Sequence, residues 1–159
     1  MAEEDRPTKT NHTRVRDWML SIGQDCPESF QFLPRKTLKL RRVLLEEESS
    51  EALEALSDLL VIAGDTRSSA GEFLYYATEA LKELADTLVV TYGAFAAMGV
   101  VADGVLGIVM DANEEKEAQG RFRADGKLIV PEVEKERIKA AAHDRIKALV
   151  KRGLVGVPE

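Results

Sequence analysis

Five carboxylates are spaced along the chain so that they could bind a metal ion together. They lie in two runs, Glu47-Glu48-x-x-Glu51 and, later, Glu83-x-x-Asp86. At about 100° per residue, each run places its acids on one helix face that also carries apolar or small residues, so the acids point toward a core. Carboxylates that converge in a core repel each other unless they are protonated or bind cations. Because all-oxygen ligands favour hard divalent ions, the pattern predicts a magnesium or manganese site.

Two other interpretations of the acidic runs must be weighed. A solvated helix face would pair its acids with Lys82, Arg41 or Arg42, which is the usual role of a glutamate run. A ferritin-like di-iron site would need Glu-x-x-His, whereas this chain has Glu-x-x-Asp, and neither His12 nor His143 stands in such a motif. The apolar stripes on both helices favour the inward-facing magnesium site over these alternatives.

Long helices must position these acids. All five prolines lie outside residues 35–130, so no residue in that stretch has to break a helix. Apolar residues recur there at spacings of three and four and predict helices over 37–63, 70–98 and 102–118, with connections short enough to make neighbours antiparallel. A short helix over 13–22 and a last amphipathic helix over 134–151 complete an all-α bundle of about four to five helices. Asp125-Gly126 predicts a tight turn, with a minimal hairpin around it.

The composition sets the class of protein. The chain has 159 residues, 45% of them hydrophobic and 31% charged, with a net charge of -6 and a single cysteine. These values favour one globular domain over 13–152, between a flexible tail over 1–12 and a second tail over 153–159. They exclude a disordered chain and a disulfide-stapled secreted domain, so we expect a cytoplasmic location. The uncharged run between Asp86 and Asp103 is too short and broken for a membrane span and predicts a buried helix.

The acidic pattern resembles the metal motif of the all-α nucleoside triphosphate pyrophosphohydrolases. That superfamily includes MazG-like enzymes, dimeric dUTPases and phosphoribosyl-ATP pyrophosphohydrolase. The likeness extends to Asn113-x-x-Lys116 and to the loop over 123–127 with Pro131 behind it, and it covers roughly residues 38–132. The bacterial MazG-like branch that acts on dUTP is the most similar, and phage relatives that act on purine deoxynucleotides also fit.

The resemblance implies a reaction and a set of site residues. The reaction is the metal-dependent hydrolysis of a deoxynucleoside triphosphate between its α- and β-phosphates, with dUTP or a purine such as dGTP as substrate. The implied metal ligands are Glu48, Glu51, Glu83 and Asp86, which would hold two or more Mg²⁺ ions, with Mn²⁺ able to substitute. Catalysis would rest on Glu47 and Glu48, and Glu47 would be a further ligand or the base that orients the attacking water.

Further residues would bind the substrate. The resemblance and the positive charge of the region imply phosphate binding by Lys116, Arg121, Arg123 and Lys127; the alternative is a solvated basic loop. Contacts to the rest of the substrate would come from Asn113, Trp18 and Asp17. Trp18 is the only tryptophan, and a nucleobase could stack on its flat aromatic ring, although a single tryptophan more often belongs to the core.

The first long helix has a second apolar side, opposite its acids. It is formed by Leu45, Ala52, Leu56 and Leu60. A helix that is apolar on two sides is sandwiched, so we expect a homodimer or homotetramer, as in the superfamily. The same feature supports a competing class, a non-catalytic helical oligomerisation or scaffold protein. The basic residues gather in the last helix and leave the remainder acidic, which argues against a nucleic-acid partner.

Overall fold

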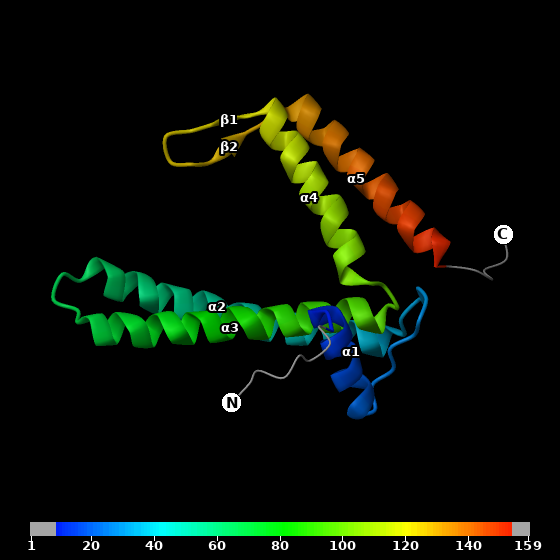
Figure 1. The fold of residues 1–159 in the computed structure, drawn as a ribbon, viewed down its shortest axis with the longest axis horizontal. Helices are drawn as coiled ribbons and strands as arrows, with labels where there is room; N and C mark the ends of the chain where they lie inside the picture. Colours follow the sequence, from blue (N-terminus) through cyan, green and yellow to red (C-terminus); the bar gives the residue numbers. More distant parts are fainter. Residues whose placement is uncertain (1–8, 154–159) are drawn as a thin grey trace, which may run out of the picture. The chain divides into compact units, whose positions relative to one another are not determined.

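The computed structural model describes residues 9–153, of which 74% are helical. In the described part of the chain, five helices and one two-stranded ribbon follow one another (Figure 1). They form two compact units, one containing residues 9–26 and 32–98 and the other containing residues 27–31 and 99–153. The predicted all-α class is therefore confirmed. The division into one domain over 13–152 and two tails stays a prediction, and residues 1–8 and 154–159 of those tails lie outside the described residues.

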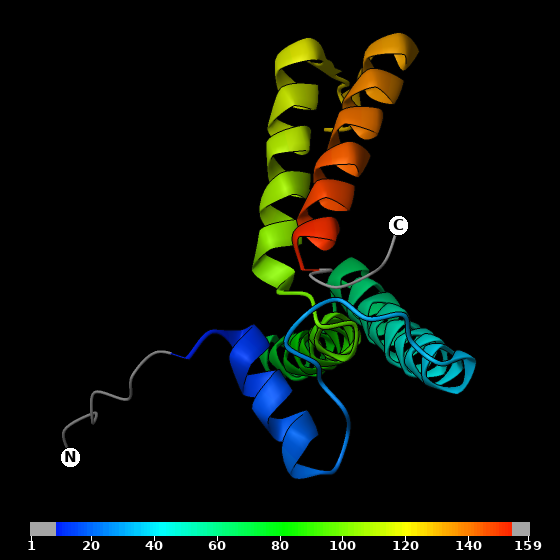
Figure 2. The ribbon, with the colours of Figure 1, turned by 90° about the vertical axis from the view of Figure 1, so that its right-hand side faces the viewer.

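The first unit is built on two long helices, α2 (Arg35–Gly64) and α3 (Ala70–Ala97). They lie side by side along most of their length in Figures 1 and 2 and run antiparallel, because only the turn at residues 65–69 separates them. A capping box starts α3, since the Ser69 hydroxyl accepts from the Glu72 amide and the Glu72 carboxylate accepts from the Ser69 amide. Ala52 of α2 and Ala80 of α3 are buried, and their small side chains let helices approach closely.

The short helix α1 (Asn11–Ser21) packs on the C-terminal part of α3. The core between them contains Met19, Cys26, Ala96 and Ala97, all at most 3% exposed. Thr10 caps α1 through a hydrogen bond from the Thr13 amide to its hydroxyl. The helix therefore begins two residues before the predicted start, and the other predicted helix ends agree with the structure to within about two residues.

The second unit pairs α4 (Ala102–Gln119) with α5 (Glu132–Arg152), which lie side by side in both views. Ile138 is buried between them, and two ion pairs of 2.6 Å join the helices, Arg137 with Glu115 and Arg145 with Asp111. The connection between the helices is the expected minimal hairpin, formed by the strands β1 (Arg121–Phe122) and β2 (Leu128–Ile129). Its turn contains Gly126 at a φ of 79°, a conformation that suits glycine.

Three further predictions concern the second apolar side of α2, the arrangement of α3 and α4, and the absence of a membrane span. Of the four residues expected on a second apolar side of α2, Leu45, Leu56 and Leu60 are exposed in the single chain. Placing Ala52 opposite the acids was wrong, because it is buried and lies one helical turn after Glu48, on the same face. The antiparallel arrangement predicted for α3 and α4 involves both units and stays a prediction. Among the described helices, none alone is long and apolar enough to cross a membrane; α3 and α4 meet that standard of length and composition only when taken together as a bent pair.

A glycine in the second unit gives a test of this packing. Gly99 has a φ of 67°, and a Cβ atom there would lie 2.1 Å from the carbonyl oxygen of Ser29. We expect Gly99→Ala to lower the free energy of unfolding by roughly 2 kcal/mol or more, measured by urea titration. Gly107→Ala is the control, because Gly107 lies within α4 and a Cβ there meets nothing within 4 Å. The control should stabilise the protein by roughly 0.5–1 kcal/mol, and equal effects of the two variants would contradict the described packing.

Candidate active site

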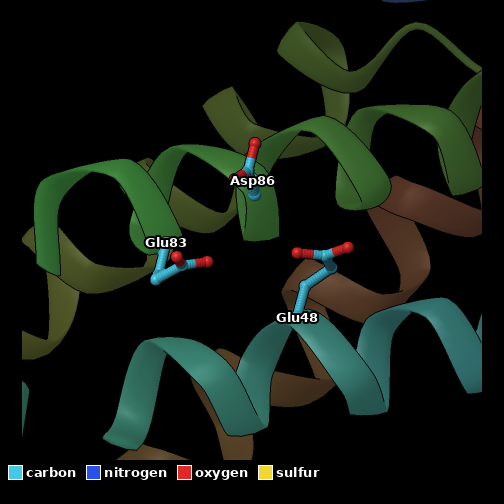
Figure 3. Close-up of side chains that lie close together, drawn as sticks. All are labelled: Glu48, Glu83 and Asp86. Carbon is cyan, nitrogen blue, oxygen red and sulfur yellow. The ribbon is translucent and has the colours of Figure 1, made fainter. Parts of the chain in front are cut away.

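Three carboxylates from the two long helices converge in the first unit. Glu48 comes from α2, and Glu83 and Asp86 come from α3 (Figure 3). One oxygen of each lies within 4.8 Å of the others, and all three residues are half-buried. We call these residues the acidic triad. The triad unites one acid of the first sequence run with both acids of the second.

Local structure explains why these acids meet. Glu83 and Asp86 are three residues apart and share one face of α3. Glu48 lies one helical turn before the buried Ala52, so it stands on the side of α2 that faces α3. The Thr87 hydroxyl lies 3.1 Å from the carbonyl oxygens of both Glu48 and Glu83 and donates to them. This bridge links the backbones of the two helices at the residues that carry the acids.

The electrostatics of the triad leave its charge incompletely balanced. Burial raises the pKa of Glu48, and the charges of Glu51, Asp86, Glu47 and Glu83 raise it further. Glu83 Oε2 is buried and accepts no hydrogen bond from any described residue. A buried oxygen without a donor is costly, and a cation would satisfy it. The all-oxygen donor set and the unpaired Glu83 oxygen therefore fit a divalent metal ion such as magnesium or manganese.

A lysine already supplies part of the missing positive charge. The Lys82 ammonium lies 2.7 Å from Glu83 Oε1 and 3.2 Å from Asp86 Oδ2. These two hydrogen bonds raise the pKa of Lys82, so the side chain is protonated at neutral pH. One element of the solvated-face interpretation is therefore present, whereas Arg42 pairs outside the triad, with Glu46. Lys82 itself remains 60% exposed.

The remaining two acids of the motif lie beside the triad. Glu47 and Glu51 are exposed on α2, and the structure does not group either with the three converging oxygens. Glu51 lines a cavity of about 430 Å³ together with Glu83, and Tyr76 lies on the same cavity. Its charge also helps to raise the pKa of Glu48. The roles predicted for Glu47 and Glu51 stay predictions.

A second cavity, of about 340 Å³, adjoins the triad in the same unit. Trp18 of α1 lines it together with Glu48 and Asp86. The contact predicted between Trp18 and the substrate stays a prediction. Asp17 lines neither this cavity nor the neighbouring one that Trp18 also borders, and it pairs with Lys9 at 2.7 Å.

Two residues on the cavity beside the triad were missed as site residues by sequence reasoning. Arg41 of α2 donates a hydrogen bond from Nη2 to Oε1 of Gln24, and both side chains line the cavity. A signal for Arg41 exists in the sequence, since it precedes Glu48 by seven residues and therefore shares its helix face. Gln24 follows α1 in a loop, where periodicity carries no information.

The predicted phosphate-binding residues and Asn113 belong to the second unit. Lys116 donates to the side-chain oxygen of Asn113 at 3.1 Å within α4. Arg121 lies in β1, Arg123 pairs with Asp125 in the hairpin turn, and the Lys127 amide donates to the same aspartate at 3.2 Å. These side chains are exposed or half-buried. Their contacts with substrate stay predictions.

The sequence matches a known protein family. The family model of phosphoribosyl-ATP pyrophosphohydrolase (PRA-PH) matches residues 15–113 of the chain. The chain belongs to this family. A search of curated proteins found no match. The PRA-PH match spans the whole acidic triad and Trp18, and it ends before Lys116 and the hairpin.

Membership of the PRA-PH family establishes the general activity. The family belongs to the MazG-like all-α pyrophosphohydrolase superfamily, so the resemblance seen in the sequence is confirmed at that level. The protein is therefore a hydrolase that acts on phosphoric anhydrides, and its substrate is a nucleotide of the triphosphate type. The scaffold alternative is excluded.

The contact between Lys82 and the triad gives a test of cation binding. We expect Lys82→Met to tighten manganese binding roughly twofold to fivefold, because it removes an exposed positive charge that competes for the same oxygens. Titration with manganese, followed by electron paramagnetic resonance, measures the change. Lys139→Met is the control, since it removes a similar exposed pair at 2.8 Å from Glu136 of α5. Unchanged affinity in Lys82→Met would show that Lys82 and the metal do not compete for the same oxygens.

Proposed function

We propose that this protein is a metal-dependent deoxynucleoside triphosphate pyrophosphohydrolase that releases a deoxynucleoside monophosphate and pyrophosphate. The observation that carries the proposal is the convergence of Glu48, Glu83 and Asp86 in a chain of the PRA-PH family. The branch that we favour is the MazG-like one that acts on dUTP or on a purine such as dGTP. The cavity of about 340 Å³ beside the triad supports a nucleotide as the ligand.

The acids have two tasks in this proposal. Glu48, Glu51, Glu83 and Asp86 would hold magnesium or manganese, two or more ions per site. The metal would neutralise the triphosphate and make water a better nucleophile near neutral pH. Water adds to the α-phosphorus, the bond to the α–β bridging oxygen breaks, and pyrophosphate leaves. Glu47 would orient that water and take its proton, or serve as a further metal ligand.

Basic and aromatic residues would hold the two ends of the substrate. Lys116, Arg121, Arg123 and Lys127 would stabilise the negative charge of the phosphates, as cations do in phosphoryl transfer. Support comes from Lys116 and Asn113, which are hydrogen-bonded to each other on α4. Trp18 would stack on the base, supported by its place on the cavity beside the triad. Asp17 and Asn113 would make polar contacts to the nucleoside.

A homodimer or homotetramer is the assembly that we propose. Its support is the exposed apolar side of α2, where Leu60 is 74% exposed and Leu45 and Leu56 are about 40% exposed in the single chain. Leu81 and Leu88 of α3 are also exposed. Exposed large apolar side chains on both long helices favour burial against another subunit.

The proposed reaction predicts the effect of removing single charges at the site. We expect Asp86→Asn and Glu51→Gln each to lower the rate of pyrophosphate release at least about a hundredfold, because a metal ligand is lost. Circular dichroism should show an unchanged helical fold. The assay incubates the protein with each canonical dNTP and magnesium, and it identifies the monophosphate and pyrophosphate formed.

The matched control for these variants is Glu46→Gln. Glu46 lies on the same helix as Glu51 but is exposed and pairs with Arg42 at 3.5 Å. Its neutral variant should retain the wild-type rate. Metal-dependent release of pyrophosphate by the double variant of Asp86 and Glu51 would refute the assignment of the site.

A further inference from the structure

The cavity beside the acidic triad has a polar end that the metal chemistry does not use. Its lining includes Glu48 and Asp86, and it also includes Trp18, Gln24 and Arg41. The first two residues belong to the triad. The other three come from α1, the loop that follows it, and the N-terminal half of α2. We infer that Arg41, held by Gln24, reads the nucleobase of the substrate and selects guanine.

Arg41 is fixed in the wall of this cavity. Its Nη2 atom donates to Oε1 of Gln24, and the side chain is partly buried. Its Nη1 atom lies against α3, because a Cβ added at Gly93 would be 3.3 Å from it. The same Cβ would be 3.2 Å from Met19 Sδ. Gly93 therefore leaves the space in which the guanidinium lies, and the group is oriented before a ligand arrives.

The Arg41–Gln24 pair presents hydrogen-bond donors only. A guanidinium has five N–H donors and no acceptor, so the amide of Gln24 must turn its oxygen toward Arg41. The amide nitrogen of Gln24, with two further donors, is then left for a ligand. Arg41 Nε is buried within the protein, so it is not one of the donors open to a ligand. The wall of the cavity offers the remaining Nη hydrogens of Arg41 and the amide hydrogens of Gln24 to whatever binds there.

Of the two purines, only guanine matches a fork of donors. It carries two adjacent acceptors, N7 and O6, which arginine binds in a bidentate manner. Adenine has an amino group in place of O6, so one of its two adjacent groups is a donor and repels the fork. Uracil has a donor between its two acceptors and does not fit the fork. Cytosine has two adjacent acceptors, N3 and O2, so the fork alone does not separate it from guanine, and the larger stacking surface of a purine must do so. Trp18, on the same cavity, supplies a surface on which a purine ring stacks.

This inference rests on the proposed function for the phosphate end of the substrate, and a binding experiment separates the two. The probes are dGTP and dATP analogues whose α–β bridging oxygen is replaced by methylene, added with magnesium. Trp18 is the only tryptophan and lines the cavity, so its fluorescence reports binding without turnover. We expect the guanine analogue to bind about tenfold to a hundredfold more tightly than the adenine analogue, the range of one bidentate contact.

The decisive variant is Arg41→Lys, which keeps the positive charge and removes the planar fork. We expect it to abolish the preference for guanine while binding of the adenine analogue stays within about twofold. Arg42→Lys is the matched control, because the neighbouring Arg42 is exposed and pairs with Glu46. It should keep the full preference.

A second variant covers the case in which Arg41→Lys fails to fold. Gln24→Glu leaves Arg41 in place and puts a carboxylate beside it. That carboxylate accepts hydrogen bonds from two N–H groups of Arg41, which are then no longer available to a base. We expect the preference for guanine to disappear here as well.

Each result has one meaning. Loss of the guanine preference in Arg41→Lys and Gln24→Glu, with its retention in Arg42→Lys, supports the inference. Equal weakening of both analogues in Arg41→Lys would mean that Arg41 binds phosphate, and absence of a preference in the wild type would mean that no base is read there. Either result overturns the inference and leaves the proposed hydrolysis intact. Selective binding of the guanine analogue without hydrolysis of any dNTP would overturn the proposed function and leave the inference standing.

Discussion

The repulsion among Glu48, Glu83 and Asp86 is the constraint on which the first unit depends. Three carboxylates with oxygens within 4.8 Å of one another would separate if the chain between them were free. Two long helices prevent this, because their backbones are joined through Thr87 at the level of the acids and approach closely around Ala52. The unit therefore holds three mutually repelling carboxylates together, and a bound cation would relieve that repulsion.

Positive charge is distributed differently in the two units. Near the triad it comes from Lys82, which is exposed and can be displaced by a cation of higher charge, and from Arg41, which Gln24 holds in the adjoining cavity. In the second unit, Arg137 and Arg145 of α5 are engaged with acids of α4 and hold that helix pair together. The basic surplus that the sequence shows in the last helix is therefore partly neutralised within its own unit. Basic side chains that hold helices together can be distinguished from basic side chains that are available to a ligand only when their acidic partners are known.

Periodicity and proline positions were sufficient to predict all five described helices, because helix formation is governed by local spacing. They also predicted that Glu48, Glu83 and Asp86 face inward. The same angular arithmetic placed Glu47 and Glu51 beside Glu48, yet both are exposed, because within its unit α2 is covered mainly by α3 along the stripe that holds Glu48 and Ala52. The Arg41–Gln24 pair could not be predicted, since it joins a helix to a loop through a side-chain hydrogen bond that no repeat encodes.

The positions of Arg41 and Glu48 on one helix connect base selection to catalysis. Seven residues separate them, which is two helical turns and an axial rise of about 10 Å. A nucleotide bound along this face would span the distance with its sugar, its phosphates at the triad and its base at Arg41. Because a helix is stiff over two turns, the base and the phosphates would be held in a fixed register. A base that fails to satisfy Arg41 would then bind weakly and misplace the α-phosphorus, so selectivity would act on the chemical step as well as on binding.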